Sequence, residues 1–350
     1  MKTPSPFRGR GSANNPKNRF EKVERVPEPP DADEISSPAT TFMPDSSKSI
    51  IAYNDSPDVG FDASVNPYRG CEHGCIYCYA RPTHEYLGFS AGLDFETKIM
   101  VKADAPELLR KELSSPKWQP RVLAMSGVTD CYQPAEKKLE LTRKCLEVLL
   151  EFRNPVTIIT KNYLVTRDID ILSKLARHRC AAVFISVTTL DEKLSGLMEP
   201  RASRPARRLA AISALAQAGV PVGYLQAPMI PGLTDAEAPA IAQAAAKAGA
   251  RYAGYVALRL PHAVKDLFEE WLAQNYPDKK NKVLNRIRAI RGGNLNDPQF
   301  SSRMRGEGIF AEQMAELFRV ACRKAGIHDR SPNLSTERFR RPKEQLKLFA

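Results

Sequence analysis

The stretch 66–86, NPYRGCEHGCIYCYARPTHEY, places three cysteines within eight residues. Cys71, Cys75 and Cys78 follow a C-x3-C-x2-C spacing, directly after the apolar segment 61–66, which we expect to form a strand. Soft thiolates in one tight loop suit zinc or an iron–sulfur cluster. Structural zinc takes four ligands, often from two C-x-x-C pairs, whereas the other four cysteines are scattered singly. Three thiolates on a four-iron cluster would leave one iron open, as a place for a substrate or cofactor to bind.

Strand and helix patterns alternate beyond the cysteines. Strands are expected at 121–125, 156–160, 181–187, 220–226 and 252–258, and helices at 104–113, 134–152, 168–176, 204–218 and 236–248. This alternation predicts an α/β fold with a parallel sheet and right-handed crossovers. With the strand at 61–66 it gives six units, which predicts a partial (β/α)6 TIM-like barrel. A flat doubly wound sheet shows the same periodicity and stays open as the alternative.

Both ends of the chain differ from this core. Residues 1–45 are rich in Pro, Ser, Asn and charge without periodicity, which predicts a poorly ordered N-terminal segment. The barrel core is expected at 46–260. Residues 261–350 show only helical patterns, at 264–274, 282–291 and 310–325, followed by a basic tail without clear structure. They are expected to form a basic helical C-terminal extension and tail.

The composition excludes several classes of protein. Of 350 residues, 43 % are hydrophobic and 26 % charged, which is typical of a globular chain with a sizeable core. No apolar run approaches the ~18 residues of a membrane helix. The first residues are basic and polar without the apolar segment of a secretory signal, so we expect a cytoplasmic protein without membrane partners. Clustered cysteines in such a protein bind metal or serve redox chemistry.

The formal net charge of +12 is concentrated near the C-terminus. Residues 278–350 carry 17 basic and 8 acidic side chains. A concentrated basic surface favours a polyanionic partner, with DNA or RNA as the candidate substrate. An ordinary basic surface is the alternative. No helix-turn-helix, zinc-finger or RNP signature occurs in the sequence.

The stretch 66–86, coming after the first strand of a six-unit pattern, resembles the radical S-adenosylmethionine (SAM) superfamily. More narrowly, it is similar to the bacterial subgroup related to spore photoproduct lyase, often labelled DNA repair photolyase-like. The resemblance implies a [4Fe-4S] cluster and SAM as cofactors. It implies reductive cleavage of SAM to a 5′-deoxyadenosyl radical, which abstracts hydrogen from a substrate. Photoproduct-lyase-like repair or modification of nucleic acid is the implied activity, with a reductant protein such as a flavodoxin or ferredoxin.

The resemblance also assigns roles to residues. Cys71, Cys75 and Cys78 are the expected cluster ligands, and Tyr77 matches an aromatic that packs beside the adenine. The remaining cofactor contacts are expected from Ser126 and Gly127 toward the SAM amino group, Lys161 near its carboxylate, Ser186 at the ribose, and the backbone around Met229 at the adenine. Where the superfamily has a Gly-Gly-Glu-like turn, this chain reads Met-Ser-Gly-Val-Thr-Asp.

One position departs from spore photoproduct lyase. That enzyme carries a hydrogen-donor cysteine a few residues before a Ser-Asp pair near the second strand. Here the matching place is Gly127 or its neighbour, whereas Cys131 falls after Thr129 and Asp130. Cys131 is the candidate catalytic thiol, and a buried apolar cysteine is the alternative.

Two other functions stay open from the sequence. The first is a radical SAM enzyme that acts on a peptide or small metabolite, whose SAM cleavage would be indifferent to nucleic acid. The second is a non-catalytic nucleic-acid-binding protein with a metal-stabilised loop, which would not cleave SAM. Two carboxylates, Asp130 and Glu199, lie on the expected site face. For each, the alternative to a functional role is a structural one, as a helix cap or as an ion-pair partner.

Overall fold

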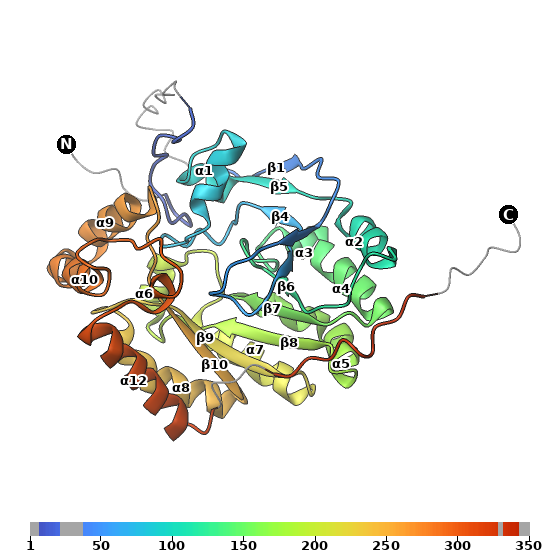
Figure 1. Ribbon diagram of the computed structural model, residues 1–350. Coiled ribbons are helices and arrows are strands. Elements are labelled where there is room, and N and C mark those ends of the chain that lie inside the picture. Colours follow the sequence, from blue (N-terminus) through green and yellow to red (C-terminus); the bar gives the residue numbers. More distant parts are fainter. Residues whose placement is uncertain (1–6, 22–37, 328–331, 343–350) are drawn as a thin grey trace, which may run out of the picture.

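The computed structural model describes residues 7–21, 38–327 and 332–342. A seven-stranded sheet with the order β10-β9-β8-β7-β6-β3-β2 forms the centre of the fold (Figure 1). Its strands are β2 (Ile51–Tyr53), β3 (Ala63–Val65), β6 (Leu123–Met125), β7 (Val156–Thr160), β8 (Ala181–Ser186), β9 (Val222–Met229) and β10 (Tyr252–Ala257). Strands β3, β6, β7, β8, β9 and β10 pair in parallel, and β2 pairs antiparallel with β3 at one edge. These six parallel strands confirm the predicted α/β fold.

Helices cover the outer face of this sheet in an arc (Figure 1). They are α2 (Ala105–Ser114), α4 (Leu141–Phe152), α5 (Ile169–Arg177), α7 (Pro205–Gln217) and α8 (Ala238–Ala248). In α4 the buried Cys145, Leu146 and Leu149 recur at helical spacing and form one apolar stripe. Every residue of β8 is buried, as expected of a parallel strand that is covered on both faces.

A second, three-stranded sheet lies beside the amino-terminal part of the core, in the order β1-β5-β4 (Figure 1). It comprises β1 (Thr41–Pro44), β4 (Tyr68–Arg69) and β5 (Lys98–Val101), with the helix α1 (Leu93–Thr97) leading into β5. The cysteine loop runs from β4 to the 3-10 helix η1 (Arg81–Leu87). This small sheet therefore anchors both ends of the stretch that carries the cysteines.

The described part of the N-terminal segment is held by polar contacts. A guanidinium N–H of Arg10 donates to the carbonyl of Glu96 at 2.9 Å, and the Asn18 amide donates to the carbonyls of Glu85 and Phe89, both at 2.9 Å. These contacts bind irregular backbone without an apolar face, so no periodicity in the sequence reveals them. The rest of the predicted poorly ordered segment, residues 1–6 and 22–37, lies outside the described residues.

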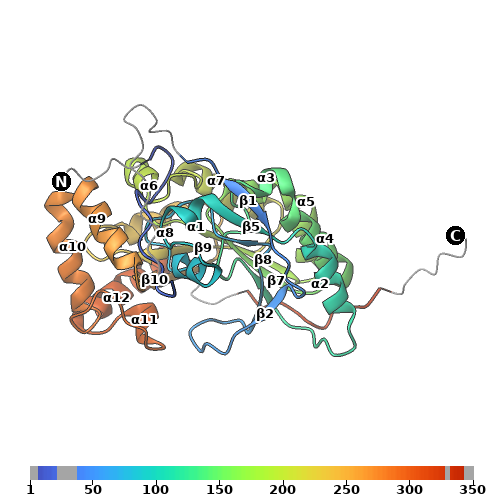
Figure 2. The same cartoon turned by 90° about the horizontal axis from the view of Figure 1, so that it is seen from above.

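The C-terminal extension is helical, as its periodicity predicts. It contains α9 (Val264–Asn275), α10 (Pro277–Ala289), α11 (Ser302–Arg305) and α12 (Ile309–Lys324). Helix α10 begins five residues before the predicted helix at 282, because Pro277 starts it and its Lys-rich first turn carries no apolar signal. Figure 2 shows α9 and α10 at one end of the sheet, on the side of β10. Of the predicted tail, residues 343–350 lie outside the described residues.

Shorter helices complete the described chain. They are α3 (Glu136–Leu139), η2 (Tyr163–Asp168), α6 (Glu192–Met198) and η3 (Asp235–Glu237). Each follows the carboxyl end of a strand of the large sheet and precedes a longer helix. No helix among the described residues combines the length and the apolar character that crossing a bilayer requires.

Candidate active site

A cavity of about 270 Å³ lies at the carboxyl ends of the parallel strands. Segments at the ends of β6, β7, β8, β9 and β10 line it together with the cysteine loop. These segments contribute Ser126 to Asp130, Thr160 and Lys161, Ser186, Ala227 and Pro228, and Val256 to Arg259. Such convergence follows from the parallel sheet, because all its carboxyl ends meet at one edge.

Cys71, Cys75 and Cys78 all line this cavity. Two tight turns bring them there: the Gly74 N–H donates to the Cys71 carbonyl at 3.3 Å, and the Cys78 N–H donates to the Cys75 carbonyl at 3.2 Å. Gly74 has a φ of +64°, and a Cβ at this position would lie 2.6 Å from a carboxylate oxygen of Glu96. Glycine is therefore required between the first two cysteines on both conformational and steric grounds.

Burial raises the pKa of each of the three thiols above its ordinary value. The Asp130 carboxylate adds to the rise at Cys71, while the Lys161 ammonium acts against it at Cys75 and Cys78. Thiols must lose their protons to bind iron. The positive charge beside the loop therefore favours the ligating form.

Arg81 stabilises the cysteine loop through hydrogen bonds to its backbone. Its guanidinium donates to the carbonyls of Cys75 at 2.9 Å and Gly74 at 3.2 Å, and it forms an ion pair with Glu96. Both side chains of this pair are fully buried. The Glu96 carboxylate in turn accepts the backbone N–H groups of Gly11 and Ser12, each at 2.9 Å. The N-terminal segment is thus part of the support of the cysteine loop.

Asp130 joins the cysteine loop to the end of β7. One of its oxygens accepts the Lys161 N–H at 2.8 Å and lies 3.2 Å from His73 Nδ1, and the other accepts the Thr160 hydroxyl at 2.7 Å. Burial alone would raise the pKa of Asp130, but His73 and these donors lower it to about 2. The carboxylate stays ionised and fixes the backbone from which the Lys161 side chain extends.

Tyr77 is held by a second buried network. Its hydroxyl donates to Glu199, which also accepts the Thr188 hydroxyl at 2.8 Å and pairs with Arg208. Although burial alone would raise the pKa of Glu199, the Arg208 and Lys161 charges lower it to about 2. Arg208 also donates to the carbonyl of Ser186 at 3.0 Å. The network fixes Tyr77 beside the end of β8, so the Tyr77 ring lines the cavity in one orientation.

Lys161 and Arg259 are the cationic side chains that line the cavity. The Lys161 ammonium donates to the Ala227 carbonyl at 3.3 Å and lies 5.9 Å from the centre of the Tyr77 ring. The Arg259 guanidinium lies 5.1 Å from the centre of the Tyr79 ring. Its Nε is buried without a hydrogen-bond partner. Both cations are therefore placed to meet an anionic ligand.

The predicted turn after β6 lies at the same cavity. Ser126 has a φ of +82°, and its hydroxyl accepts the Cys131 N–H at 2.8 Å, which closes the turn. Ser126 and Gly127 line the cavity, as do Tyr77, Lys161 and Ser186. Five of the predicted cofactor contacts thus lie around one cavity with the three cysteines.

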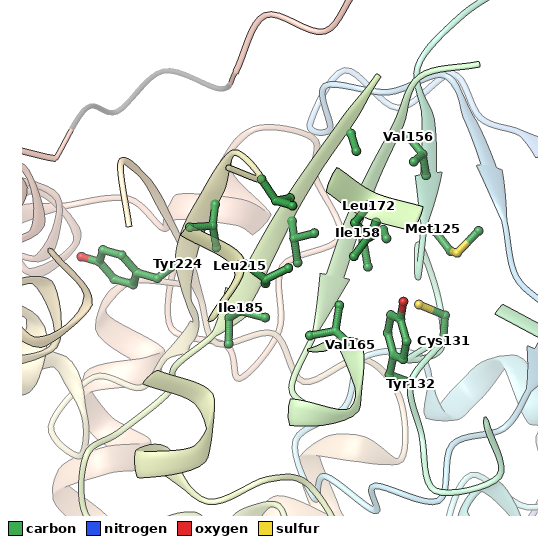
Figure 3. Close-up of a cluster of buried hydrophobic side chains, with 14 of the residues drawn as sticks. Met125, Cys131, Tyr132, Val156, Ile158, Val165, Leu172, Ile185, Leu215 and Tyr224 are labelled. Atoms are coloured by element: carbon green, nitrogen blue, oxygen red, sulfur yellow. The ribbon is translucent and has the colours of Figure 1, made fainter. Parts of the chain in front are cut away.

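Two predicted site residues lie elsewhere. Cys131 is 1 % exposed and belongs to the main hydrophobic cluster, where Figure 3 shows it with Met125, Tyr132 and Val165. It is not among the residues that line the cavity, so its placement matches that of an apolar core residue. Met229 is likewise fully buried in that cluster, and its neighbours Ala227 and Pro228 line the cavity instead.

The sequence analysis missed three residues of this region. No sequence pattern pointed to Arg81 and Glu96, because the two residues of a buried ion pair follow no characteristic spacing. Arg259 could have been found, since it follows the predicted strand at 252–258 and the carboxyl ends of parallel strands form the site.

The donor set fits an iron–sulfur cluster. Three soft sulfur donors line one cavity, and the other described cysteines do not line it. A four-iron cluster takes its thiolates on separate iron atoms. The arrangement is therefore suited to a cluster that three thiolates of this chain hold.

A family model described as the Radical SAM superfamily matches residues 65–245 of this chain. An uncharacterized protein of Mycobacterium tuberculosis is 34 % identical over 275 residues, which cover 78 % of each of the two chains. An uncharacterized protein of Methanocaldococcus jannaschii is 28 % identical over 222 residues, which cover 63 % of this chain and 79 % of that protein.

Two solved structures have a similar fold. Spore photoproduct lyase complexed with dinucleoside spore photoproduct aligns with a TM-score of 0.58 and 15 % identity, over 82 % of this chain and 80 % of that chain. A mutant of spore photoproduct lyase with bound AdoMet and dinucleoside spore photoproduct aligns with a TM-score of 0.56 and 16 % identity, over 81 % and 78 %.

Proposed function

This chain belongs to the radical SAM superfamily, and we propose that Cys71, Cys75 and Cys78 hold a [4Fe-4S] cluster while SAM occupies the cavity at the strand ends. The observation that carries the proposal is that the three cysteines and five predicted cofactor contacts line one cavity. The family match confirms the resemblance drawn from residues 66–86, and the chain is a radical SAM enzyme.

The protein supplies binding, orientation and protection to such a cofactor. When bound, the cluster and SAM together supply methionine and a 5′-deoxyadenosyl radical after the transfer of one electron. In this proposal Lys161 would offer its ammonium to the SAM carboxylate, and Ser126 and Gly127 would offer a hydroxyl and backbone groups to the SAM amino group. Ser186 offers a hydroxyl to the ribose.

The proposed contacts to the SAM adenine come from the Tyr77 ring and from a segment of backbone. Tyr77 presents a ring whose hydroxyl is already bound to Glu199, so the ring itself is the part that faces the cofactor. Of the backbone segment expected around Met229, Ala227 and Pro228 line the cavity, and the Met229 side chain is buried in the core. On the outer side, Phe61 and Met304 line the cavity with apolar surface that excludes water from a radical.

The proposed substrate is a nucleic acid, on which the enzyme performs repair or modification. Arg259 lines the cavity beside Tyr79, whose side chain is exposed, and a cation next to an aromatic ring suits a phosphate and a base. The excess of basic side chains in residues 278–350 supports the same substrate class.

Anaerobic reconstitution tests the cofactor proposal. The protein is loaded with iron and sulfide, SAM and dithionite are added, and 5′-deoxyadenosine is measured. The control is the triple variant Cys71→Ala/Cys75→Ala/Cys78→Ala, which is expected to form none. A loaded wild-type cluster that neither binds nor cleaves SAM would overturn the proposal.

The substrate proposal is tested with the same assay. Single-stranded DNA, ultraviolet-treated DNA and RNA are added separately, and deoxyadenosine formation is expected to rise with one of them. Binding of that polymer is expected to weaken as the salt concentration rises, because lysines and arginines displace counterions from the phosphates. A rate that responds to peptides or small metabolites and ignores nucleic acid would contradict the substrate class.

A further inference from the structure

Two turns at the amino-terminal edge of the large sheet carry arginine in a left-handed backbone conformation. Arg153, between α4 and β7, has a φ of +51°, and Arg179, between α5 and β8, has a φ of +57°. The corresponding turns after α7 and α8 carry Gly219 and Gly249 at positive φ. Glycine adopts this conformation without the steric cost that a side chain has. Arginine at these two turns therefore costs the fold free energy, which points to a use for the two side chains.

The C-terminal segment 332–342 brings further arginines to the same edge. Figure 1 shows this segment, in red, running past α5. Its backbone N–H groups donate to the carbonyls of Arg179 and Phe152, in each case at 2.9 Å. Arg338 and Arg340 are exposed in this segment. The segment therefore adds two arginines beside the two turns.

Arginines from these separate segments lie around one histidine. The pKa of His178 is lowered first by burial and then by the charges of Arg153, Arg338 and Arg340. Arg153, His178 and Arg340 also line one hollow of about 440 Å³, together with the exposed Lys174 of α5. The basic side chains of α4, α5 and the C-terminal segment thus form one surface.

The acidic residues that line this hollow already have basic partners. Glu147 and Asp170 pair with Arg143, at 3.6 and 2.9 Å, and Glu151 pairs with Arg110 at 2.5 Å. Five other basic residues at this edge form no ion pair with any residue that the structure describes. We call them the distal basic cluster: Arg153, Lys174, Arg179, Arg338 and Arg340.

The cluster has the chemistry of a phosphate-binding surface. Glu337 is the acidic residue of segment 332–342, so positive charge predominates. A guanidinium can bind two oxygens of one phosphate. Surfaces that dock proteins or enter membranes present aromatic or apolar anchors. None of the exposed large hydrophobic side chains of the described chain lies in the segments that carry the cluster. Basic side chains without such anchors bind the nucleic-acid backbone without reading its sequence.

We propose that the distal basic cluster binds the phosphodiester backbone of a nucleic acid at the end of the sheet opposite the cavity. The inference rests on the proposed function for its substrate class. β7 and β8 have five and six residues, and a strand rises about 3.3 Å per residue, so the cluster lies about 20 Å from the cavity. A polymer that reaches both must be longer than about six nucleotides, at about 3.4 Å per step. The cluster therefore holds the flanking part of the polymer and not the reacting nucleotide.

The test uses the double variant Arg153→Gly/Arg179→Gly. Glycine suits both turns, so the midpoint of urea unfolding is expected to stay at the wild-type value or to rise. The variant gives up one hydrogen bond of 3.4 Å, from Arg179 to the Asn333 carbonyl. A lower midpoint with unchanged affinity for DNA would assign the two arginines to the fold and overturn the proposal.

A matched control and a second variant accompany the double variant. The control Lys265→Gln/Lys282→Gln also removes two charges, from exposed positions of α9 and α10, which lie on the side of β10 (Figure 2). The second variant is Arg338→Gln. The Arg338 side chain is exposed and makes no hydrogen bond or ion pair with a described residue, so the fold does not depend on it.

The first measurement is binding of labelled single-stranded DNA of about 40 nucleotides, followed by fluorescence anisotropy over a range of salt concentrations. At about 0.1 M salt the dissociation constant of the double variant is expected to rise about tenfold or more, while that of the control stays within about threefold of wild type. The slope of log affinity against log salt should become shallower by about 1.4 in the double variant and by about 0.7 in Arg338→Gln, because each phosphate contact contributes about 0.7. Unchanged affinity and slope in both variants, or an equal loss in the control, would overturn the proposal.

The second measurement separates binding from chemistry. In the dithionite assay, the DNA concentration that half-maximally stimulates deoxyadenosine formation is expected to rise about tenfold in the double variant, while the rate at saturating DNA stays at the wild-type value. If wild type forms no deoxyadenosine, the proposed function fails, and the anisotropy measurement still decides whether the cluster binds nucleic acid. Vesicles of phosphatidylglycerol and phosphatidylcholine are the third probe. A double variant that loses affinity for these vesicles and keeps its affinity for DNA would show a membrane-binding surface, and the proposal would be wrong.

Discussion

Arg81 and Glu96 form a fully buried ion pair that joins three segments of the chain. Arg81 binds the carbonyls of the cysteine loop, and Glu96 binds the backbone of Gly11 and Ser12. A buried charge that loses its partner is left without compensation in a medium of low dielectric constant. The Arg81–Glu96 pair therefore supports the geometry of the cysteine loop.

The variant Glu96→Gln is expected to lower the free energy of unfolding by about 3–5 kcal/mol, because Arg81 stays buried and unpaired. Iron incorporation after reconstitution should fall with it. Both are measured directly, by urea unfolding and by iron content per chain. As a control, Glu316→Gln removes the exposed pair with Arg319 and should leave the free energy of unfolding unchanged within the error of the measurement, because solvent screens an exposed ion pair. Equal effects of the two variants would contradict the role of the buried pair.

His84 is expected to make stability depend on pH. Burial, opposed by its bond to the Lys98 carbonyl and by Asp94, lowers the pKa of His84 from 6.5 to about 4, and Lys98 and Arg81 add to the lowering. The unfolded chain then binds the proton first as the pH falls, so stability is full above pH 6.5 and is lost between 6.5 and 4. The loss by pH 5 is about 2 kcal/mol.

The check is urea unfolding of wild type and His84→Asn at pH 7.5, 6 and 5. The wild-type free energy of unfolding should fall with pH more steeply than that of the variant, whose side chain does not titrate. Parallel curves for the two proteins would show that another group causes the pH dependence.

The parallel sheet with its crossover helices and the cysteine loop could be predicted because each depends on local pattern. The alternation of β-branched strands such as Val156–Thr160 with amphipathic helices such as Leu141–Phe152 is visible along the chain. The positions of Lys161 and Ser186 followed from the same pattern, since each comes at the end of a strand.

The supporting contacts could not be predicted, because they join residues far apart in sequence. Gly11 meets Glu96, and Arg208 meets Glu199, through polar contacts without periodicity. Among the arginines between 201 and 208, Arg208 is almost fully buried, and Arg201 pairs with Glu72 in the cysteine loop.

The variant Cys131→Ala distinguishes a core residue from a hydrogen donor. Because the thiol lies in the hydrophobic cluster (Figure 3), its loss should leave a small cavity and cost about 1 kcal/mol of stability. Deoxyadenosine formation and product formation should both stay within about threefold of wild type. Retained SAM cleavage with a loss of product would show instead that Cys131 returns hydrogen to the substrate radical.

The variant Lys161→Gln removes the positive charge that faces the expected SAM carboxylate. A hydrogen bond to a charged group contributes about 1.5–3 kcal/mol, so the dissociation constant for SAM should rise about 10- to 100-fold. The backbone N–H of residue 161 still binds Asp130, so the cysteine loop keeps its anchor and cluster absorbance should match wild type. Equilibrium dialysis with labelled SAM measures the affinity, and Lys174→Gln on α5 is the control for loss of charge. An unchanged affinity would mean that Lys161 acts only through Glu199, whose pKa it lowers, and the carboxylate contact would have to be assigned to another residue of the cavity.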